Sequence, residues 1–238
     1  MKKILVAATM AALLVGGAFA KSKNNVNFEA SAGFAYGLSD IFYTDSNTST
    51  KHDFMVNSLG VKAEGTMWLT DQLGFQLDTA FLWPFSTTDK TTNLNNGNSN
   101  SETVNADGGQ FVFNGLIGPV FKINLNKSFD LVIGAGFDMA MYSYSYKTSN
   151  VNLALLNGKS GTVTNSYLNF GIGATVDATY KLDKNMGLKF GVTGAFLWGS
   201  QYNTHRHSDD GTYNQDTTTN TSTNAFYIIP DVSFVYKF

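Results

Sequence analysis

Residues 167–182 alternate between two kinds of side chain along their whole length. Their even-numbered positions are apolar or aromatic, whereas the odd-numbered positions, apart from Tyr167, are small, polar or charged. A period of two is typical of a β-strand with two chemically opposite faces. The stretch is far longer than an ordinary strand of about five or six residues. We therefore predict a long strand whose two faces meet different surroundings.

The same alternation recurs along the chain, in eight segments joined by connections that are alternately short and long. The segments are Phe28–Phe42, Phe54–Leu69, Leu73–Phe85, Gln110–Ile123, Phe129–Tyr144, Tyr167–Leu182, Met186–Gly199 and Ala225–Phe238. The short connections are 70–72, 124–128 and 183–185, and the long ones are 44–53, 86–109, 145–166 and 200–224. The long connections are rich in Asn, Thr, Ser, Gly and Asp, which predicts solvated, mobile surface loops.

Residues 1–20 have the organisation of a secretory signal peptide. Lys2 and Lys3 form a basic start, Ile4–Val15 is an apolar core, and Ala18-Phe19-Ala20 matches the rule of small residues at a cleavage site. The apolar core is too short to span a membrane as a helix, which argues against an uncleaved anchor. We predict cleavage after Ala20 and one mature domain, residues 21–238.

A membrane location follows from the strands. No segment after the leader has the run of about 18 apolar residues that a spanning helix needs. Strands cross a bilayer only as a closed barrel, because the backbone groups of an open edge would lack hydrogen-bond partners. The sequence therefore predicts an all-β fold: a membrane-embedded, eight-stranded, antiparallel up-and-down barrel with short turns at one end and long loops at the other.

The volumes of the side chains indicate which face of each strand points outward. The polar face is rich in glycine, and the interior of an eight-stranded barrel is just wide enough for side chains to fill it. The other face carries large apolar residues at nearly every position. A soluble, lipocalin-like barrel would turn that face inward and would need a much wider interior. We therefore expect the apolar face to contact lipid.

Two tryptophans on the apolar face indicate the outer membrane interface. Trp83 and Trp198 lie nine and eleven residues after Gly74 and Gly187, which begin their strands. With a rise of about 3.4 Å per residue and a tilt near 40°, these spacings correspond to heights of roughly 23–29 Å. The apolar band of such barrels is about 25 Å tall. We therefore expect both rings in an outer aromatic girdle.

Charged residues on the inward face form a second candidate site. Those at similar depth are Lys62, Glu64, Asp78, Asp177, Lys189 and Asp231. Buried charges have to be paired or neutralised, so we predict a pairing network that fills the lumen and leaves no open pore. A cation-preferring pore or proton path is a second interpretation. Paired carboxylates for acid–base chemistry of the glycosidase type are a third, although no cleft is implied.

Other chemistry has little support in the sequence. There is no cysteine, which removes disulfides and thiolate sites, and a formal net charge of -2 gives no reason to expect a nucleic-acid partner. His205-Arg206-His207, followed by Asp209 and Asp210, is a weak metal-binding pattern. His52-Asp53 with a distant serine would suit a lipid-modifying enzyme, but no Gly-x-Ser-x-Gly motif is present. We expect no metal, no cofactor and no enzymatic activity.

The end of the sequence carries the most specific short signal. Val232, Phe234, Tyr236 and Phe238 alternate with polar or smaller residues, and Phe238 is the last residue. This stripe resembles the C-terminal signature of outer-membrane proteins, and the whole of 28–238 resembles the small eight-stranded outer-membrane β-barrels of the OmpX, OmpA-barrel and OmpW types. The resemblance implies recognition of Phe234, Tyr236 and Phe238 by the barrel-assembly machinery.

The resemblance also implies a location and a set of roles. It places the mature protein in the outer membrane of a diderm bacterium, in contact with outer-membrane lipid. The roles are surface adhesion or host interaction through the loops, membrane structure, or uptake of small hydrophobic molecules. We expect a membrane-structural and surface-interaction, adhesin-like role without an open pore, with a host or surface molecule as ligand. Transport of small, including hydrophobic, molecules is the alternative.

Overall fold

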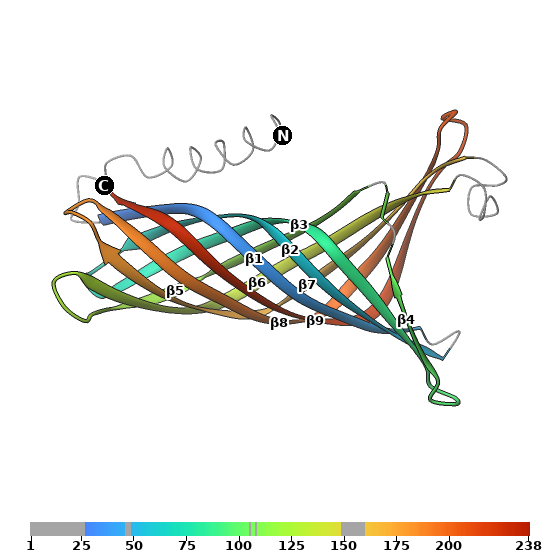
Figure 1. Ribbon diagram of the computed structural model, residues 1–238, viewed down its shortest axis with the longest axis horizontal. Coiled ribbons are helices and arrows are strands. Elements are labelled where there is room, and N and C mark those ends of the chain that lie inside the picture. Colours follow the sequence, from blue (N-terminus) through green and yellow to red (C-terminus); the bar gives the residue numbers. More distant parts are fainter. Residues whose placement is uncertain (1–26, 46–48, 105, 108, 149–159) are drawn as a thin grey trace.

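The computed structural model describes residues 27–45, 49–104, 106–107, 109–148 and 160–238, so the predicted signal peptide lies outside the described residues. The elements are strands: β1 (Asn27–Asp45), β2 (Thr50–Trp68), β3 (Leu73–Asn93), β4 (Ser99–Thr103), β5 (Gly109–Asn124), β6 (Phe129–Thr148), β7 (Gly161–Lys181), β8 (Met186–Ser208) and β9 (Asn214–Lys237). Figure 1 shows them as one barrel of tilted strands with long extensions at one end.

Eight of these strands form a closed antiparallel ring. Each ring strand pairs with the next ring strand along the chain, so that β3 pairs with β2 and β5, and β9 closes the ring by pairing with β1. The short strand β4 lies outside the ring and pairs only with β3. The prediction of an eight-stranded antiparallel barrel is therefore confirmed. The described residues contain no helix that is long and apolar enough to span a membrane.

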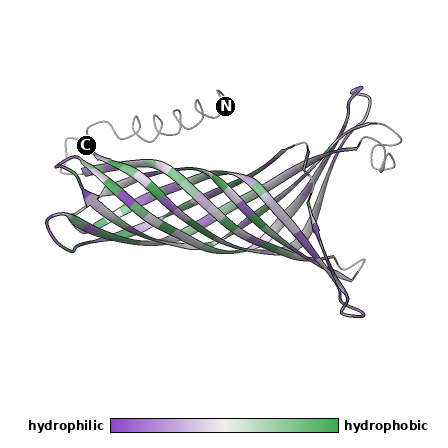
Figure 2. Ribbon diagram, in the orientation of Figure 1, coloured by the Kyte–Doolittle hydropathy of each residue, from purple (hydrophilic) through white to green (hydrophobic). Residues whose placement is uncertain are grey.

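The two faces of the ring have opposite chemistry, as the alternation predicts. Large apolar side chains such as Phe34, Ile172 and Phe234 are exposed on the outside, with 80%, 63% and 68% of their surface accessible. The charged side chains of the same strands are buried inside. Figure 2 shows the resulting alternation of hydrophobic and hydrophilic positions along the barrel strands. The outside is therefore an apolar surface of the kind that a bilayer covers, and a lipocalin-like arrangement is wrong.

The strands are longer at the loop end than the alternation predicts. The strands β7, β8 and β9 contain 21, 23 and 24 residues, whereas a barrel strand needs roughly 9–11 residues to cross a bilayer. Much of the segments predicted as loops, 44–53, 86–109, 145–166 and 200–224, continues as paired strand, and β4 lies within 86–109. The predicted loop boundaries are wrong for these parts, because backbone pairing continues there without an apolar face.

Two extra residues shift the strand faces near the loop end of the barrel. Asn57 pairs with Ser86 and Ser58 with Pro84, so Phe85 is an extra residue in β3. Gly199, with a φ of 67°, is the corresponding extra residue in β8. A bulge of this kind turns the inward side of a strand from even to odd positions or the reverse. Gly199 directly follows Trp198, and Phe85 comes two residues after Trp83, so both bulges lie beside the tryptophans of the predicted outer girdle.

Above the bulges the extended strands separate into two groups. The β1–β9 pairing stops at Tyr43 and Thr223, and the β3–β5 pairing stops at Leu82 and Val112. Within each group the ladders continue to the tips, between β1, β2, β3 and β4 on one side and between β6, β7, β8 and β9 on the other. Figure 1 shows the β3–β4 and β8–β9 hairpins pointing away from each other. We call these groups the two surface sheets.

Candidate functional site in the barrel interior

The predicted charge network lies inside the barrel, in a layer that we call the charge layer: Lys62, Glu64, Asp78, Asp177, Lys189 and Asp231. The Lys62 Nζ atom is 2.8 Å from Asp231 Oδ1 and 3.0 Å from Asp78 Oδ2. It also donates to the Thr193 hydroxyl at 2.8 Å. The ammonium group of Lys189 forms an ion pair with Glu64. The layer thus links strands β2, β3, β8 and β9 across the interior.

Asp177 belongs to the charge layer without a lysine of its own. Its carboxylate accepts a hydrogen bond from Thr175 at 3.2 Å and forms no ion pair in the described part of the chain. A Cβ at Gly191 would lie 2.2 Å from Asp177 Oδ1 and 2.5 Å from Asp231 Oδ1. The missing side chain of Gly191 is therefore what allows these two carboxylates to approach each other. The layer contains four acids and two lysines, and the hydroxyl groups of Thr175 and Thr193 donate further hydrogen bonds to Asp177 and Asp78.

A second layer, nearer the loop end, is apolar and aromatic; we call it the aromatic plug. Tyr142, Tyr167 and Tyr227 are fully buried in it together with Leu82 and other side chains, namely Ile41, Phe54, Val56, Val112, Leu197 and Ile229. The Tyr142 and Tyr167 rings are stacked with their centroids 6.2 Å apart. The Tyr142 hydroxyl donates to Gln110 at 2.9 Å. Large rings in well-packed contact occupy the lumen above the charge layer.

Two signals for this plug are present in the sequence, and the prediction did not use them. Tyr167 interrupts the series of small and polar residues on the inward face of its strand, and Leu82 shares its face with Gln76 and Asp78. Large apolar residues at inward positions indicate a change in the filling of the lumen. The prediction treated the inward face as small and charged throughout, so it missed the plug.

The histidines do not form the arrangements that the sequence suggested. His52 Nδ1 lies 3.0 Å from Asp89 Oδ2, and the His52 ring stacks on Tyr43 with 4.8 Å between centroids. His52 is thus paired with Asp89 and not with the neighbouring Asp53. His205 contacts Asp216 on the adjacent strand. In the described residues, no three metal-ligating side chains come together.

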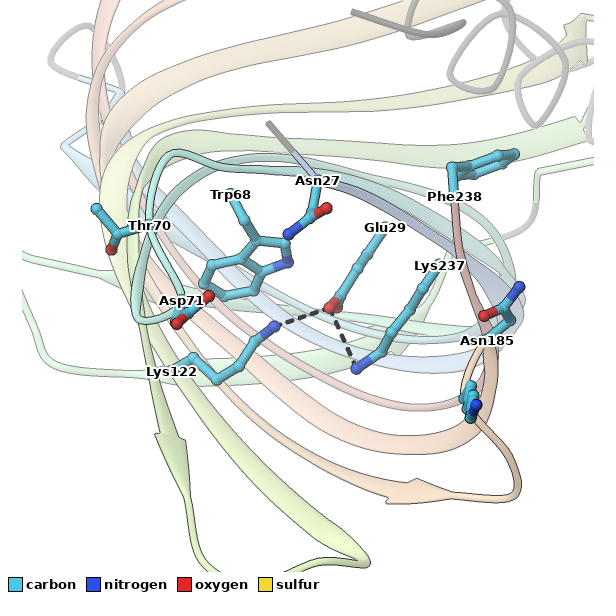
Figure 3. Close-up of a pocket in the computed structure, with 10 residues that line it drawn as sticks. Asn27, Glu29, Trp68, Thr70, Asp71, Lys122, Asn185, Lys237 and Phe238 are labelled. Carbon is cyan, nitrogen blue, oxygen red and sulfur yellow. Dashed lines mark hydrogen bonds and ion pairs between the residues drawn. The ribbon is translucent and has the colours of Figure 1, made fainter. Parts of the chain in front are cut away.

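At the short-turn end the lumen opens into a pocket of about 310 Å³, which we call the vestibule. Its lining residues are Asn27, Glu29, Trp68, Thr70, Asp71, Lys122, Lys184, Asn185, Lys237 and Phe238. Lys122 Nζ and Lys237 Nζ lie 2.8 and 3.2 Å from the same atom, Glu29 Oε1. Figure 3 shows both ammonium groups pointing to this carboxylate. A much smaller gap of about 10 Å³ shares Glu29 and Trp68 with the vestibule and is also lined by Glu64 and Lys189.

The remaining predicted site residues lie on the outside of the barrel. Trp83 and Trp198 are outward and partly exposed, each next to its bulge. Phe234, Tyr236 and Phe238 are outward at the short-turn end, and the last two rings meet edge-on at 4.9 Å. The backbone N–H of Phe238 donates to the Phe28 carbonyl at 2.9 Å, which continues the contact between β9 and β1. These side chains are placed where lipid would contact them.

Comparison with known proteins gives the fold and no more. No family model matches the chain, and no curated protein matches its sequence. Among solved structures, a major outer membrane protein from Thermus thermophilus has a TM-score of 0.59 at 14% identity, with 90% of this chain and 100% of that chain covered. The outer membrane protein OprG from Pseudomonas aeruginosa has a TM-score of 0.52 at 13% identity, with coverage of 89% and 95%.

The closed antiparallel ring, its apolar outside and these structural matches define an outer-membrane β-barrel. More narrowly, the chain has the fold of the small eight-stranded outer-membrane barrels. In bacterial barrels of this kind the short turns face the periplasm and the long connections face the outside. The vestibule is therefore on the periplasmic side, and the two surface sheets are on the outer side.

Proposed function

We propose that the protein is a closed outer-membrane barrel that interacts with molecules at the cell surface through its two surface sheets. The observation that supports this proposal most is the length of the strands beyond the membrane. After Trp198, β8 continues from Gly199 to Ser208, which at about 3.4 Å per residue is an extension of roughly 30 Å. A barrel with only a membrane-structural role has no need of paired sheets of this height.

The filling of the lumen supports a barrel without an open pore. The ion pairs of the charge layer occupy the middle, and the aromatic plug occupies the part above it. Eight-stranded interiors are filled by side chains, whereas aqueous channels occur in porins of about 16 to 18 strands. The proposal therefore assigns the activity to the outer surface and includes no catalytic role.

Transport of small molecules remains the alternative function, and two breaks in the strand pairing favour it. The β5–β6 ladder is interrupted at Gly118 and Pro119, and the β1–β9 ladder is interrupted beside Pro230. Proline has no N–H to contribute to a ladder. However, the hollow beside Pro119 has about 0 Å³ of room for a water-sized molecule. A route through the wall would need these strands to move apart.

The surface role can be tested by shortening one hairpin. Deletion of residues 203–206 together with 215–218 removes four mutually paired positions from β8 and from β9. The even number in each strand keeps the inward and outward sides of the remaining residues unchanged. A matched deletion of 91–92 with 99–100 shortens the β3–β4 hairpin. Adherence of cells carrying equal surface amounts of each form would be measured on cultured host cells and on immobilised matrix glycans.

We expect cells with the wild-type protein to adhere in larger numbers than cells that lack it. We expect one or both deletions to abolish this difference. Equal adherence with and without the protein would contradict the surface role. Single-channel recording in planar bilayers tests the alternative, and we expect negligible conductance. Stable cation-selective channels whose selectivity falls in Asp177→Asn would make transport the better proposal.

We also propose the maturation and location that the sequence predicts. The protein would lose residues 1–20 after Ala20 and would be assembled by the barrel-assembly machinery into the outer membrane, with lipid around its apolar outside. Membrane fractionation and N-terminal sequencing of the purified protein test this directly. An N-terminus other than Lys21, or recovery in the inner-membrane fraction, would contradict it.

A further inference from the structure

The vestibule is a blind pocket on the periplasmic side. It narrows toward Glu64 and Lys189, and the charge layer and aromatic plug fill the lumen beyond. A molecule that enters from the periplasm therefore meets a closed end. Its volume of about 310 Å³ is at the lower end of the range of small-molecule sites, about 300–1,000 Å³. This shape suits binding rather than passage.

Trp68 forms one wall of the vestibule and has an unused hydrogen-bond donor. Its side chain is 3% exposed, and its ring lies against Gly74, where a Cβ would come within 2.8 Å of the indole. The indole Nε1 is buried without a hydrogen-bond partner. Figure 3 shows this nitrogen on the edge of the ring nearest Asn27 and Glu29. A buried N–H without an acceptor is unfavourable, so this nitrogen is a donor that an acceptor atom in the vestibule would satisfy.

The lysines of the vestibule add further donors. Lys122 Nζ lies 3.7 Å from the centroid of the Trp68 ring and donates to Glu29 at 2.8 Å. Lys237 lies 3.2 Å from the same Glu29 oxygen. Lys237 Nζ also lies 3.6 Å from Asp130 Oδ2, whereas the ion pair of Lys122 in the described residues is with Glu29 alone. Because an ammonium group carries three donors, Lys122 has donors left for a ligand. Lys184 also lines the pocket. The indole of Trp68 and the ammonium group of Lys122 therefore present donors to the same pocket.

We propose that the vestibule binds a carboxylate-bearing small molecule from the periplasm, such as an organic acid or the free end of a short peptide. One carboxylate oxygen would accept from Trp68 Nε1 and the other from Lys122 or Lys237. A monoanion fits better than a phosphate dianion, because Glu29 and Asp71 lie in the same lining and would repel a second negative charge. This site is independent of the proposed surface role.

The indole N–H of Trp68 provides a direct readout. In a Trp83→Phe/Trp198→Phe background, Trp68 is the one remaining tryptophan, since the sequence contains three. The refolded protein in detergent micelles would be titrated with N-acetyl-Ala-Ala, which has one free carboxylate, with its C-terminal amide, with lactate, a monoanionic organic acid, and with inorganic phosphate. The 15N–1H resonance of the indole would be followed throughout.

We expect a saturable shift of the indole resonance with N-acetyl-Ala-Ala or lactate and none with the amide. A response to N-acetyl-Ala-Ala alone would identify a peptide end as the ligand, and a response to lactate would identify an organic acid. Lys237→Met, which removes one of the two lysines that share Glu29, should weaken binding at least about tenfold. Lys127→Met, in the exposed turn between β5 and β6, should leave it unchanged.

Three results would overturn the proposal. The first is a resonance that does not move with either carboxylate. The second is an equal or stronger response to phosphate, which would make the vestibule a general anion site. The third is unchanged affinity in Lys237→Met, provided that this variant migrates as the folded form on an unboiled gel. If Lys237→Met does not fold, Lys184→Met, at the rim of the same pocket, gives the corresponding test.

Discussion

Lys62 on β2 and Asp231 on β9 form an ion pair inside the barrel, with 2.8 Å between Nζ and Oδ1 and a separation of 169 positions in the sequence. The two strands are not neighbours, because β1 lies between them. The pair therefore ties the beginning of the barrel to its end through the interior, in addition to the backbone ladders of the wall. Its side chains are almost completely buried.

Removal of Lys62 should destabilise the barrel strongly. Lys62→Met leaves Asp78 and Asp231 buried without their common cation, and loss of one partner from a buried pair costs about 3–5 kcal/mol. The measurement is the free energy of unfolding in urea, in detergent micelles. Lys127→Met, at an exposed turn position, should stay within about 0.5 kcal/mol. A similar small effect for Lys62→Met would mean that the pair contributes little.

Gly191→Ala should be destabilising because the new methyl group would meet two carboxylates. Its Cβ would lie 2.2 and 2.5 Å from oxygens of Asp177 and Asp231, so both side chains have to move. Such overpacking typically costs about 1–3 kcal/mol. Gly194→Ala on the same strand is the matched control, since its nearest neighbour would be a backbone oxygen at 3.7 Å. Equal unfolding free energies for the two variants would contradict this account of Gly191.

An arginine on the outer face should cost more in the middle of the membrane than near its edge. Val176 lies five residues from the periplasmic end of β7 at Lys181, a height of roughly 13 Å, whereas Phe170 is at roughly 29 Å. Val176→Arg should therefore cost about 2–4 kcal/mol and Phe170→Arg about 0–1 kcal/mol. Unfolding of both variants in lipid bilayers measures the difference. The opposite order would invalidate the membrane depth that we assign to the barrel.

Phe238 should matter more for assembly in cells than for stability. We propose that the stripe of Phe234, Tyr236 and Phe238 is read by the assembly machinery, so Phe238→Lys should lower outer-membrane levels while refolding in vitro changes little. Phe75→Lys places the same charge on an exposed aromatic position near the same end of the barrel. If both variants reach the outer membrane in equal amounts, Phe238 has no special role in recognition.

The sequence predicted the membrane part of the barrel well, because a lipid-facing surface imposes alternation. The inward placement of Asp78 and Asp177 and the outward placement of Trp83 follow from that pattern. The ion-pair partners could not be predicted, since they depend on the stagger between non-neighbouring strands. The predicted pairing network implies a lysine beside Asp177. In the structure, the Asp177 carboxylate instead accepts a hydrogen bond from the Thr175 hydroxyl.

The outer parts of the strands could not be predicted for a different reason. Between Ser200 and Asn224 the sequence is rich in Thr and Asn and has no apolar period, yet β8 and β9 remain paired there. Backbone hydrogen bonds to a neighbouring strand sustain the ladder without a hydrophobic face. The extra residues Phe85 and Gly199 also exchange even and odd positions on the inward side of β3 and β8. The alternation therefore changes phase within each strand, so a constant alternation does not predict that the strand continues.

These two extra residues have a consequence for the evolution of the protein. Because Phe85 and Gly199 absorb the change of side next to the membrane boundary, the outer parts of β3 and β8 do not have to keep the phase of the lipid-facing pattern below them. We therefore expect that changes of sequence above the bulges of these two strands leave the orientation of the side chains in the bilayer unchanged.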